Sequence, residues 1–534
     1  MVFSRNTLFP ALVGLLLLTL AATGCTTRPG GRKGPHTAPL PELWPDGDDL
    51  STGRSGCDPL SGAAEPGGTF TVAVYDSVQP RRAPVPHNRS ERLVFASLYE
   101  TLVEVDCDGT VGPGLAEHWA CTSDSTTWVF TLRADARFWD GSRVTSEEIR
   151  QAWIANAGCP RAPDRTSPWA WLNTASGSIS CPDAQRLAIQ LPEPQGQFPL
   201  MLAHPATAVA VKRSGWTWPV GSGPGRLRAS TPAPLPELEC RPNPHHPQAP
   251  AWKSLTFLVQ PGADPRDAVN SGVDLALIQD LPSVRYFTEA PGYTATALPW
   301  ARLYLLVCAP DQNPTGTERW VNPVGRLRPD RDLTRVAARA WPDIVLPSGE
   351  RQDCPQLTGP VALAGAARRG WHLDRLQLDG DALGFVDSDP GARELAHRLA
   401  ALADDRVRPV GLPADALGFT LDWQMAGAWV VAVDQIFPTG CLQLAALLGR
   451  TAWLQKAALT HPAGGAENLV QAQQLSDAPF DPGRNLTRQG LVTPLALTHS
   501  WLVSRGRLGG LTLTFDGLPR LSGLGQASEG APIP

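Results

Sequence analysis

Several short stretches of the chain have the hydrophobic pattern of strands in a packed sheet. In TTWVFTLR (126–133), Trp128, Phe130 and Leu132 alternate with polar or smaller residues, which predicts a strand with one strongly apolar face. WVVAV (429–433) is apolar throughout, which predicts a buried strand with the acidic residue Asp434 at its end. Both stretches indicate scaffold around a core.

A turn and a capped helix follow the first of these strands. Gly141, after an aspartate, supplies a turn position at which positive φ is allowed. Thr145 stands three residues before Glu148, the spacing of a capping box that opens a helix. Ile149 and Trp153 then form the apolar face of this predicted helix.

The N-terminus indicates export. The apolar run 11–20 (ALVGLLLLTL) has the build of a signal-peptide core, and ATGC (22–25) resembles a bacterial lipobox. We expect 1–24 to be a lipoprotein signal peptide and Cys25 to be lipidated, which places the protein on the outer face of the cell membrane. The alternatives are an ordinary signal peptide and an N-terminal membrane anchor. Residues 25–66 are rich in Pro, Gly, Ser and Asp, as in a flexible tether.

Length and charge restrict the remaining classes. At 534 residues the chain is too long for a single compact core, which allows two or three lobes. A net charge of −5 does not resemble the basic face of a nucleic-acid-binding protein, so we expect no nucleic-acid partner.

Motifs for metal binding and catalysis are missing from the sequence. No CxxC or HxxxH spacing occurs, and the adjacent His245 and His246 stand in a proline-rich stretch typical of a solvated loop. GSG (221–223) falls short of the G-x-S-x-G nucleophile elbow, and no GK[ST] loop is present to bind phosphate. We therefore expect no enzyme activity, no metal and no cofactor.

Cysteine usage agrees with an oxidising compartment. Ten cysteines are present, so nine are left after the lipidated Cys25. The pairs closest in sequence are the predicted disulfides, Cys107 with Cys121 and Cys159 with Cys181. The sequence leaves five others unassigned: Cys57, Cys240, Cys308, Cys354 and Cys441.

One long stretch resembles a known family. Residues 98–153 read LYETLVEVDCDGTVGPGLAEHWACTSDSTTWVFTLRADARFWDGSRVTSEEIRQAW. They resemble the signature region of the bacterial extracellular solute-binding proteins of family 5, the dipeptide-, oligopeptide- and nickel-binding lipoproteins of ABC importers. Further segments follow the family pattern in order: 187–212, 219–230, 238–246, 270–278, 301–310 and 490–503.

The resemblance implies an α/β fold of the two-lobed, type II periplasmic-binding-protein kind. Each lobe would hold a mixed sheet flanked by helices, and the lobes would close around a solute at a hinge near residues 298 and 495. Lobe I would consist of 67–105, 214–298 and 495–534, the small subdomain of 106–213, and lobe II of 299–494.

The resemblance also suggests a contact for the solute. In peptide-binding members, an aspartate in a G-W-x-x-D-Y-x-D/E-P motif pairs with the N-terminal amine of the peptide. AWVVAVDQIFPTG (428–440) aligns without gaps and places Asp434 on that aspartate and Pro438 on the closing proline, although the aromatic positions are lost. We expect Asp434 to have no partner inside the protein; the alternative is a solvated loop aspartate.

Other candidate contacts lie on the first predicted strand and among the tryptophans. TFTVAVYDSVQP (69–80) matches a family segment that runs along the cleft and offers backbone partners to extended peptides. The ligand candidates are Tyr75, Asp76 and Ser77 at its end, together with Trp300, Trp423 and Trp429. A role in closing a core strand is the alternative for the first three.

These observations predict a monomeric solute-binding lipoprotein of an ABC importer. It would capture a peptide or other small solute and deliver it to an ABC permease in the membrane, to which lipid on Cys25 would anchor it. The alternative is a non-transport lipoprotein on the same fold that acts in assembling envelope glycolipids of the phosphatidylinositol mannoside type.

Overall fold

The computed structural model describes residues 63–157, 178–309, 378–434 and 489–527, apart from short gaps, with 323, 327, 334–335 and 454. All of these belong to the compact unit Glu42–Pro534. The predicted signal peptide and most of the predicted tether lie outside the described residues. So do six residues named above: Cys25, Cys57, Cys159, Cys354, Pro438 and Cys441.

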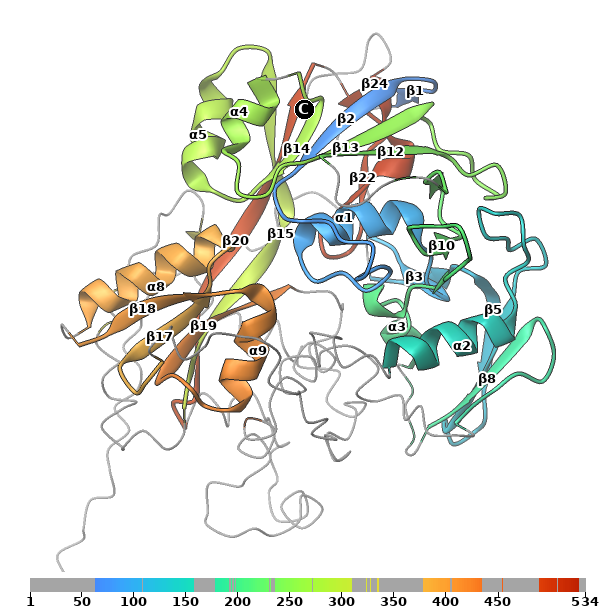
Figure 1. The fold of residues 1–534 in the computed structure, drawn as a ribbon, viewed down its shortest axis with the longest axis horizontal. Helices are drawn as coiled ribbons and strands as arrows, with labels where there is room; N and C mark the ends of the chain where they lie inside the picture. Colours follow the sequence, from blue (N-terminus) through green and yellow to red (C-terminus); the bar gives the residue numbers. More distant parts are fainter. Residues whose placement is uncertain are drawn as a thin grey trace, which may run out of the picture. The chain divides into compact units, whose positions relative to one another are not determined.

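A mixed sheet of eleven strands forms the centre of the described structure (Figure 1). Its strands are β2 (Thr69–Val74), β11 (Gly225–Arg226), β12 (Glu237–Pro242), β13 (Ser254–Val259), β14 (Leu275–Ile278), β15 (Tyr293–Cys308), β16 (Thr334–Arg335), β17 (Ala382–Val386), β18 (Arg408–Leu412), β19 (Ala428–Asp434) and β20 (Val492–Arg505). The order is β11-β12-β13-β2-β14-β20-β15-β19-β17-β18, with β16 paired to β20 off this path. β2 is parallel to β13 and β14, whereas β15 is antiparallel to β19 and β20, so the sheet is mixed.

Two long strands connect the two ends of this sheet. β15 and β20 pair with each other from Tyr293↔Arg505 to Val307↔Val492. The last part of β20 also pairs with β14, and the second half of β15 pairs with β19. The register shifts between Ala297 and Ala301 and again after Tyr304, where prolines interrupt the ladder as they do at bulges. The predicted crossovers near 298 and 495 therefore fall inside two continuous strands.

Alternation along β15 accounts for the helices on both faces of its second half. Leu303, Leu305 and Val307 belong to a buried cluster with α9 (Ala414–Asp422). Tyr304 and Leu306 belong to a separate buried cluster with α8 (Pro390–Leu402). Because successive side chains of a strand point to opposite faces, this apolar run needs cover on both sides.

The other half of the sheet carries its own helices. α5 (Leu281–Glu289) contributes Val284 and Phe287 to a buried cluster with β14 and β20. The Asp280 side chain caps α5 by accepting from the Ser283 N–H at 2.9 Å. The remaining helices in this region are α1 (Arg89–Leu98) and α4 (Pro265–Asn270).

A smaller sheet lies within 106–213 and has the order β5-β6-β8-β7. On β6 (Thr127–Leu132), Trp128, Phe130 and Leu132 are buried, so the predicted one-faced strand is confirmed. The predicted cap is confirmed as well, since Glu148 N–H donates to Thr145 Oγ1 at 3.3 Å at the start of α2 (Ser146–Ala157). The other elements nearby are β3 (Val103–Val105), β4 (Val111–Pro113), β5 (Ala116–Cys121), β7 (Ile179–Ser180), β8 (Arg186–Gln190), α3 (Phe198–Met201), η2 (Pro205–Thr207), β9 (Ala210–Val211) and β10 (Val220–Gly221).

Short strands bring the first and last described segments together. β1 (Ala64–Glu65) pairs with β24 (Gly525–Ala527), which pairs with β21 (Leu508–Gly509). β22 (Thr512–Leu513) pairs with β23 (Pro519–Arg520), and η4 (Leu521–Gly523) follows. In the part of the chain that the structure describes, no helix is long and apolar enough to cross a membrane.

Candidate functional site

The carboxylate at the end of β19 is held by an arginine on the neighbouring strand. Arg302 and Asp434 are directly paired across β15 and β19. The guanidinium donates from Nε to Oδ1 at 2.7 Å and from Nη2 to Oδ2 at 3.1 Å. The buried strand ending in an acid is confirmed, but the expectation that Asp434 has no partner inside the protein is wrong. The sequence could not show this, because the partner lies 132 residues away.

A second carboxylate completes the coordination of Arg302. Asp389 accepts from Arg302 Nη1 at 2.6 Å through one oxygen. Its other oxygen accepts from the Tyr304 hydroxyl at 2.8 Å and from the Ala392 N–H at 3.0 Å, where it caps α8. Asp389 therefore connects the start of α8 to Arg302. Sequence reasoning identified neither Asp389 nor Arg302. The available signal was the Asp-Pro pair that opens the helix.

Burial and charge act in opposite directions in this cluster. Burial by itself would raise the pKa of Asp434, but the charge and hydrogen bonds of Arg302 outweigh it and hold this pKa well below its usual range. Burial would lower the pKa of Arg302, and the two carboxylates raise it instead. Arg302 and Asp434 are therefore both charged across the physiological range.

The segment after β2 approaches the same cluster. Burial raises the pKa of Asp76, against the lowering effects of its hydrogen bond with Ser90 and of the nearby Arg302 charge. Ser90 Oγ donates to Asp76 Oδ2 at 3.0 Å. Arg89, which begins α1, lies in the fields of Asp434 and Arg302, although burial lowers its pKa most. Two predicted contacts, Asp76 and Asp434, thus both lie in the electrostatic field of Arg302.

The two neighbours of Asp76 have local structural partners. The Tyr75 hydroxyl donates to the Pro265 carbonyl at 3.5 Å, and burial raises its pKa above the ordinary value. The Ser77 carbonyl accepts from Asn88 Nδ2 at 2.9 Å, and Asn88 caps α1. Their role as solute contacts stays a prediction.

The three predicted tryptophans lie in different environments. Trp429 is fully buried in the cluster with α9, and its indole N–H donates to Thr420 Oγ1 at 3.3 Å. This corrects the prediction for Trp429, because a side chain enclosed by the core cannot touch a solute. Trp423 follows α9 and is 64% exposed, so it is accessible. Trp300 falls at the register shift of β15, and its side chain is outside the described residues.

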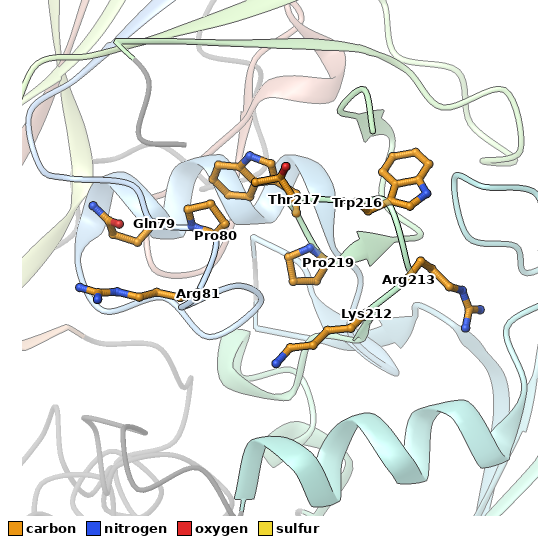
Figure 2. Close-up of a pocket in the computed structure, with 9 residues that line it drawn as sticks. Gln79, Pro80, Arg81, Lys212, Arg213, Trp216, Thr217 and Pro219 are labelled. Atoms are coloured by element: carbon orange, nitrogen blue, oxygen red, sulfur yellow. The ribbon is translucent and has the colours of Figure 1, made fainter. Parts of the chain in front are cut away.

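A cavity of about 510 Å³ adjoins the same β2–α1 connection (Figure 2). One wall is the segment 79–81, which follows Ser77 in the chain. The other wall is 212–219, between β9 and β10. Figure 2 shows Arg81 on the first segment and Lys212, Arg213 and Trp216 on the second. Sequence reasoning missed this cavity, because its two walls are far apart in the chain.

The cysteines do not pair as their spacing suggests. Cys107 is disulfide-bonded, whereas Cys121 and Cys181 are free thiols, as are the buried Cys240 and Cys308. Both predicted disulfides are therefore wrong. Cys107 follows β3, whereas Cys121 ends β5 in a different sheet, so nearness in sequence did not mean nearness in space.

The described charges and hydrogen bonds suit binding. Among the described residues there is no group of three or more His, Cys, Asp or Glu side chains that could hold a metal ion. The cluster around Arg302 offers fixed charges of both signs, and the cavity beside it offers cationic and aromatic side chains.

Comparison with known proteins finds similarity to one family. The profile described as "Bacterial extracellular solute-binding proteins, family 5 Middle" matches residues 110–319. Over these residues the chain is similar to this family of solute-binding proteins. The resemblance noted in the sequence is thereby confirmed.

Curated relatives match this chain over part of their length. The nickel-binding periplasmic protein of Escherichia coli is 26% identical over 227 residues, which are 39% of this chain and 42% of the relative. The periplasmic oligopeptide-binding protein OppA of Escherichia coli is 29% identical over 149 residues, 24% of this chain and 26% of the relative. The aligned regions thus span less than half of these relatives.

The likeness in structure extends further than the likeness in sequence. The murein tripeptide binding protein MppA of Escherichia coli superposes with a TM-score of 0.60 at 16% identity, covering 88% of this chain and 100% of that one. At this identity the match establishes the fold alone. The predicted fold class, α/β of the type II periplasmic-binding-protein kind, is confirmed.

Proposed function

We propose that this protein is an extracytoplasmic solute-binding lipoprotein of an ABC importer. It captures a peptide-like solute between two lobes and delivers it to a permease in the membrane. It acts as a monomer without catalysis or a cofactor, and lipid on Cys25 anchors it.

The observation that carries the proposal is that the two ends of the β15–β20 pair belong to different groups of strands, with charged side chains where these groups meet. One part of this strand pair is flanked by β14, and the other by β19. Arg302 and Asp434 stand just after the register shift between these parts. The charge of Arg302 also acts on Asp76, which follows β2, and lowers its pKa against the effect of burial. Charged groups at a junction between two groups of strands suit a solute that contacts both.

The solute ammonium would share Asp434 with Arg302. A carboxylate accepts several hydrogen bonds, so the internal bidentate pair leaves lone pairs for a further donor. The side chain of Asp434 is 25% exposed, which keeps it within reach of solvent and solute. Tyr75, Asp76, Ser77, Trp300 and the exposed Trp423 are the other proposed contacts.

The test is binding of an equimolar tripeptide library, read by native mass spectrometry of the mature protein. We expect discrete complexes, with Asp434→Asn weakening the best binders about thirty-fold or more, since stranding one member of a buried charge pair costs roughly 2–5 kcal/mol. Asp389→Asn is the matched control, because its carboxylate caps a helix and touches Arg302 from the other side. Loss of binding in both variants alike would make Asp434 a structural residue. No complex with any tripeptide would refute peptide capture.

The lipid anchor has a separate test in the intact mass of protein purified from membranes. A diacylglyceryl or triacyl adduct on Cys25 is expected. A free Cys25, or a mature N-terminus elsewhere, would contradict the anchor.

A non-transport role in glycolipid assembly is the second candidate, favoured by the internal pairing of Asp434 with Arg302. A carboxylate already neutralised by a guanidinium is a weaker anchor for an ammonium than an unpaired one. Co-sedimentation with phosphatidylinositol vesicles, combined with a negative tripeptide screen, would favour this role. Tripeptide complexes without vesicle binding would exclude it.

A further inference from the structure

The cavity between 79–81 and 212–219 has a lining of one charge sign. Nine residues line it, and none of them is an aspartate or a glutamate. Three are cations, namely Arg81, Lys212 and Arg213. A concave surface lined by one sign of charge attracts counter-charged solutes.

One of the three cations is already neutralised. Arg213 donates from Nη2 to Glu148 at 2.5 Å and from Nε to Asp140 at 3.1 Å. Its guanidinium also lies 5.6 Å from the ring centroid of Phe138. These contacts hold Arg213 in the wall of the cavity. Its positive charge is largely balanced by the two carboxylates of the protein.

The other two cations have no such partner. Arg81 and Lys212 are both exposed, and neither forms an ion pair with a carboxylate of the described residues. The neighbouring Arg82 differs, since it pairs with Glu91 at 3.3 Å. Burial, and then the charges of Arg82 and Arg81, lower the pKa of His87 to about 3.

The backbone that carries Arg81 is held in place by hydrogen bonds to a side chain of α1. Glu91 on α1 accepts from the Gln79 N–H at 3.0 Å and from the His87 N–H at 2.9 Å. One buried carboxylate thus ties both ends of the segment around Arg81. A fixed backbone lowers the entropy that binding at this segment would cost.

An indole in the cavity wall also lacks a partner. Trp218 is 2% exposed, and its Nε1 has no hydrogen-bond acceptor among the described residues. An unsatisfied buried donor destabilises the fold. Trp218 lines the cavity, although its Nε1 is itself buried. Trp216 lines the same cavity and packs against Trp139 with ring centroids 6.1 Å apart.

We propose that this cavity is a subsite for an anionic group of the solute, a carboxylate or phosphate that Arg81 and Lys212 receive beside Trp216 and Trp218. The inference deepens the proposed function and rests on it, because it takes the ligand of the cavity to be part of the captured solute. It selects anionic solutes, such as peptides with a free C-terminal carboxylate, over neutral or cationic ones.

The test uses the reactivity of Lys212 toward an acylating reagent, read by peptide mass spectrometry. Lys253, an exposed lysine at the start of the β13 segment, is the control within the same molecule. The probes are inorganic phosphate, inositol 1-phosphate, the tripeptide library with free carboxylates, and the same library with C-terminal amides. Protection of Lys212 but not of Lys253 by at least one anionic probe is expected, with less protection by the amidated library.

Variants test the contribution of each cation. Arg81→Gln and Lys212→Gln should each weaken binding of the protecting probe about five- to tenfold, as expected for charged hydrogen bonds that are partly screened. Lys253→Gln should leave this affinity unchanged. All three variants replace exposed side chains, so their melting temperatures should match that of the wild type.

The outcomes separate the subsite from the proposed function. If the free-carboxylate library binds while Lys212 reacts as before with every probe, the anion subsite is refuted and peptide capture stands. Protection by phosphate without binding of any tripeptide supports the subsite and refutes peptide capture. Protection by inositol 1-phosphate alone assigns the anion to a lipid headgroup. Equal protection by the free and amidated libraries refutes selection of the carboxylate.

Discussion

Arg302 and Asp434 face each other on β15 and β19, and the guanidinium binds both carboxylate oxygens, at 2.7 and 3.1 Å. The carboxylate that the family resemblance assigns to a solute amine is thus held by a cation of the protein itself. Asp389 binds the same guanidinium at 2.6 Å, so one arginine serves two acids. The cluster is therefore a fixed part of the fold as well as a candidate contact.

Removal of Arg302 should destabilise the fold. Arg302→Met would strand two carboxylates, of which Asp389 is 5% and Asp434 25% exposed. We expect the free energy of unfolding in urea to fall by about 3 kcal/mol, at the low end for a broken buried pair because Asp434 is partly solvated. Arg398→Met is the control, since its pair with Glu394 is exposed and should contribute only about 0–1 kcal/mol. Equal losses in the two variants would contradict a structural role for the cluster.

Local patterns were sufficient to predict some parts of this site and insufficient for others. The buried strand ending at Asp434 was predictable, because five consecutive apolar residues leave few alternatives to a buried strand. Its partner Arg302 was not, because antiparallel pairing of β15 with β19 sets that contact across 132 residues. Any of many arginines would have been an equally good candidate on sequence alone.

The same distinction explains the cavity and the cysteines. Arg81 and Lys212 line one cavity only after the segments that carry them, β2 to α1 and β9 to β10, have folded together, so no motif contains both. Cys107 and Cys121 are close in sequence, yet Cys107 lies in the connection between β3 and β4, and Cys121 ends β5 in a different sheet. Spacing predicts a helix cap because the cap is local, and it fails for a disulfide because the bond depends on tertiary structure.

His204 should make stability depend on pH. Burial, with a smaller effect of Arg92, lowers its pKa to about 3, and its Nδ1 accepts from the Ala206 N–H at 3.0 Å. In the unfolded chain the pKa is about 6.5, so the unfolded state binds a proton that the folded state excludes. This contribution is fully present above about pH 6.5 and is lost as the pH falls toward 3.

The measurement is urea unfolding between pH 7.5 and about 4. His204→Asn keeps a side-chain acceptor at the start of η2 and removes the titrating group. We expect its stability to fall less with acidification than that of the wild type, by up to about 1.4 kcal/mol per pH unit. His118→Asn, at an exposed position on β5, is the control. Identical slopes for wild type and His204→Asn would show that His204 is not the group responsible.

Alkylation of the native protein should distinguish the cysteines. Cys121 is exposed and free, so it should react with iodoacetamide at once. Cys240 and Cys308 should react only after unfolding, because burial encloses both thiols and raises their pKa values. Non-reducing peptide maps should show Cys107 linked to a cysteine other than these. A linked peptide containing Cys107 and Cys121 would restore the pairing that the sequence suggested.

Binding of a solute should change the angle between the two groups of strands that share β15 and β20. The two strands are continuous, but their shared ladder shifts register twice, each time near a proline, Pro299 on β15 and Pro494 on β20. Interrupted ladders bend more easily than regular ones, so these positions are the expected hinge. We expect small-angle scattering to report a smaller radius of gyration with the free-carboxylate tripeptide library. The value should approach about 24 Å, as for a compact chain of roughly 500 residues.

Asp434→Asn with the same library is the control, because a variant that binds weakly should stay open. Compaction of the variant without binding would place its cause outside the site, and an unchanged radius in a wild-type protein that binds would rule out the clamp.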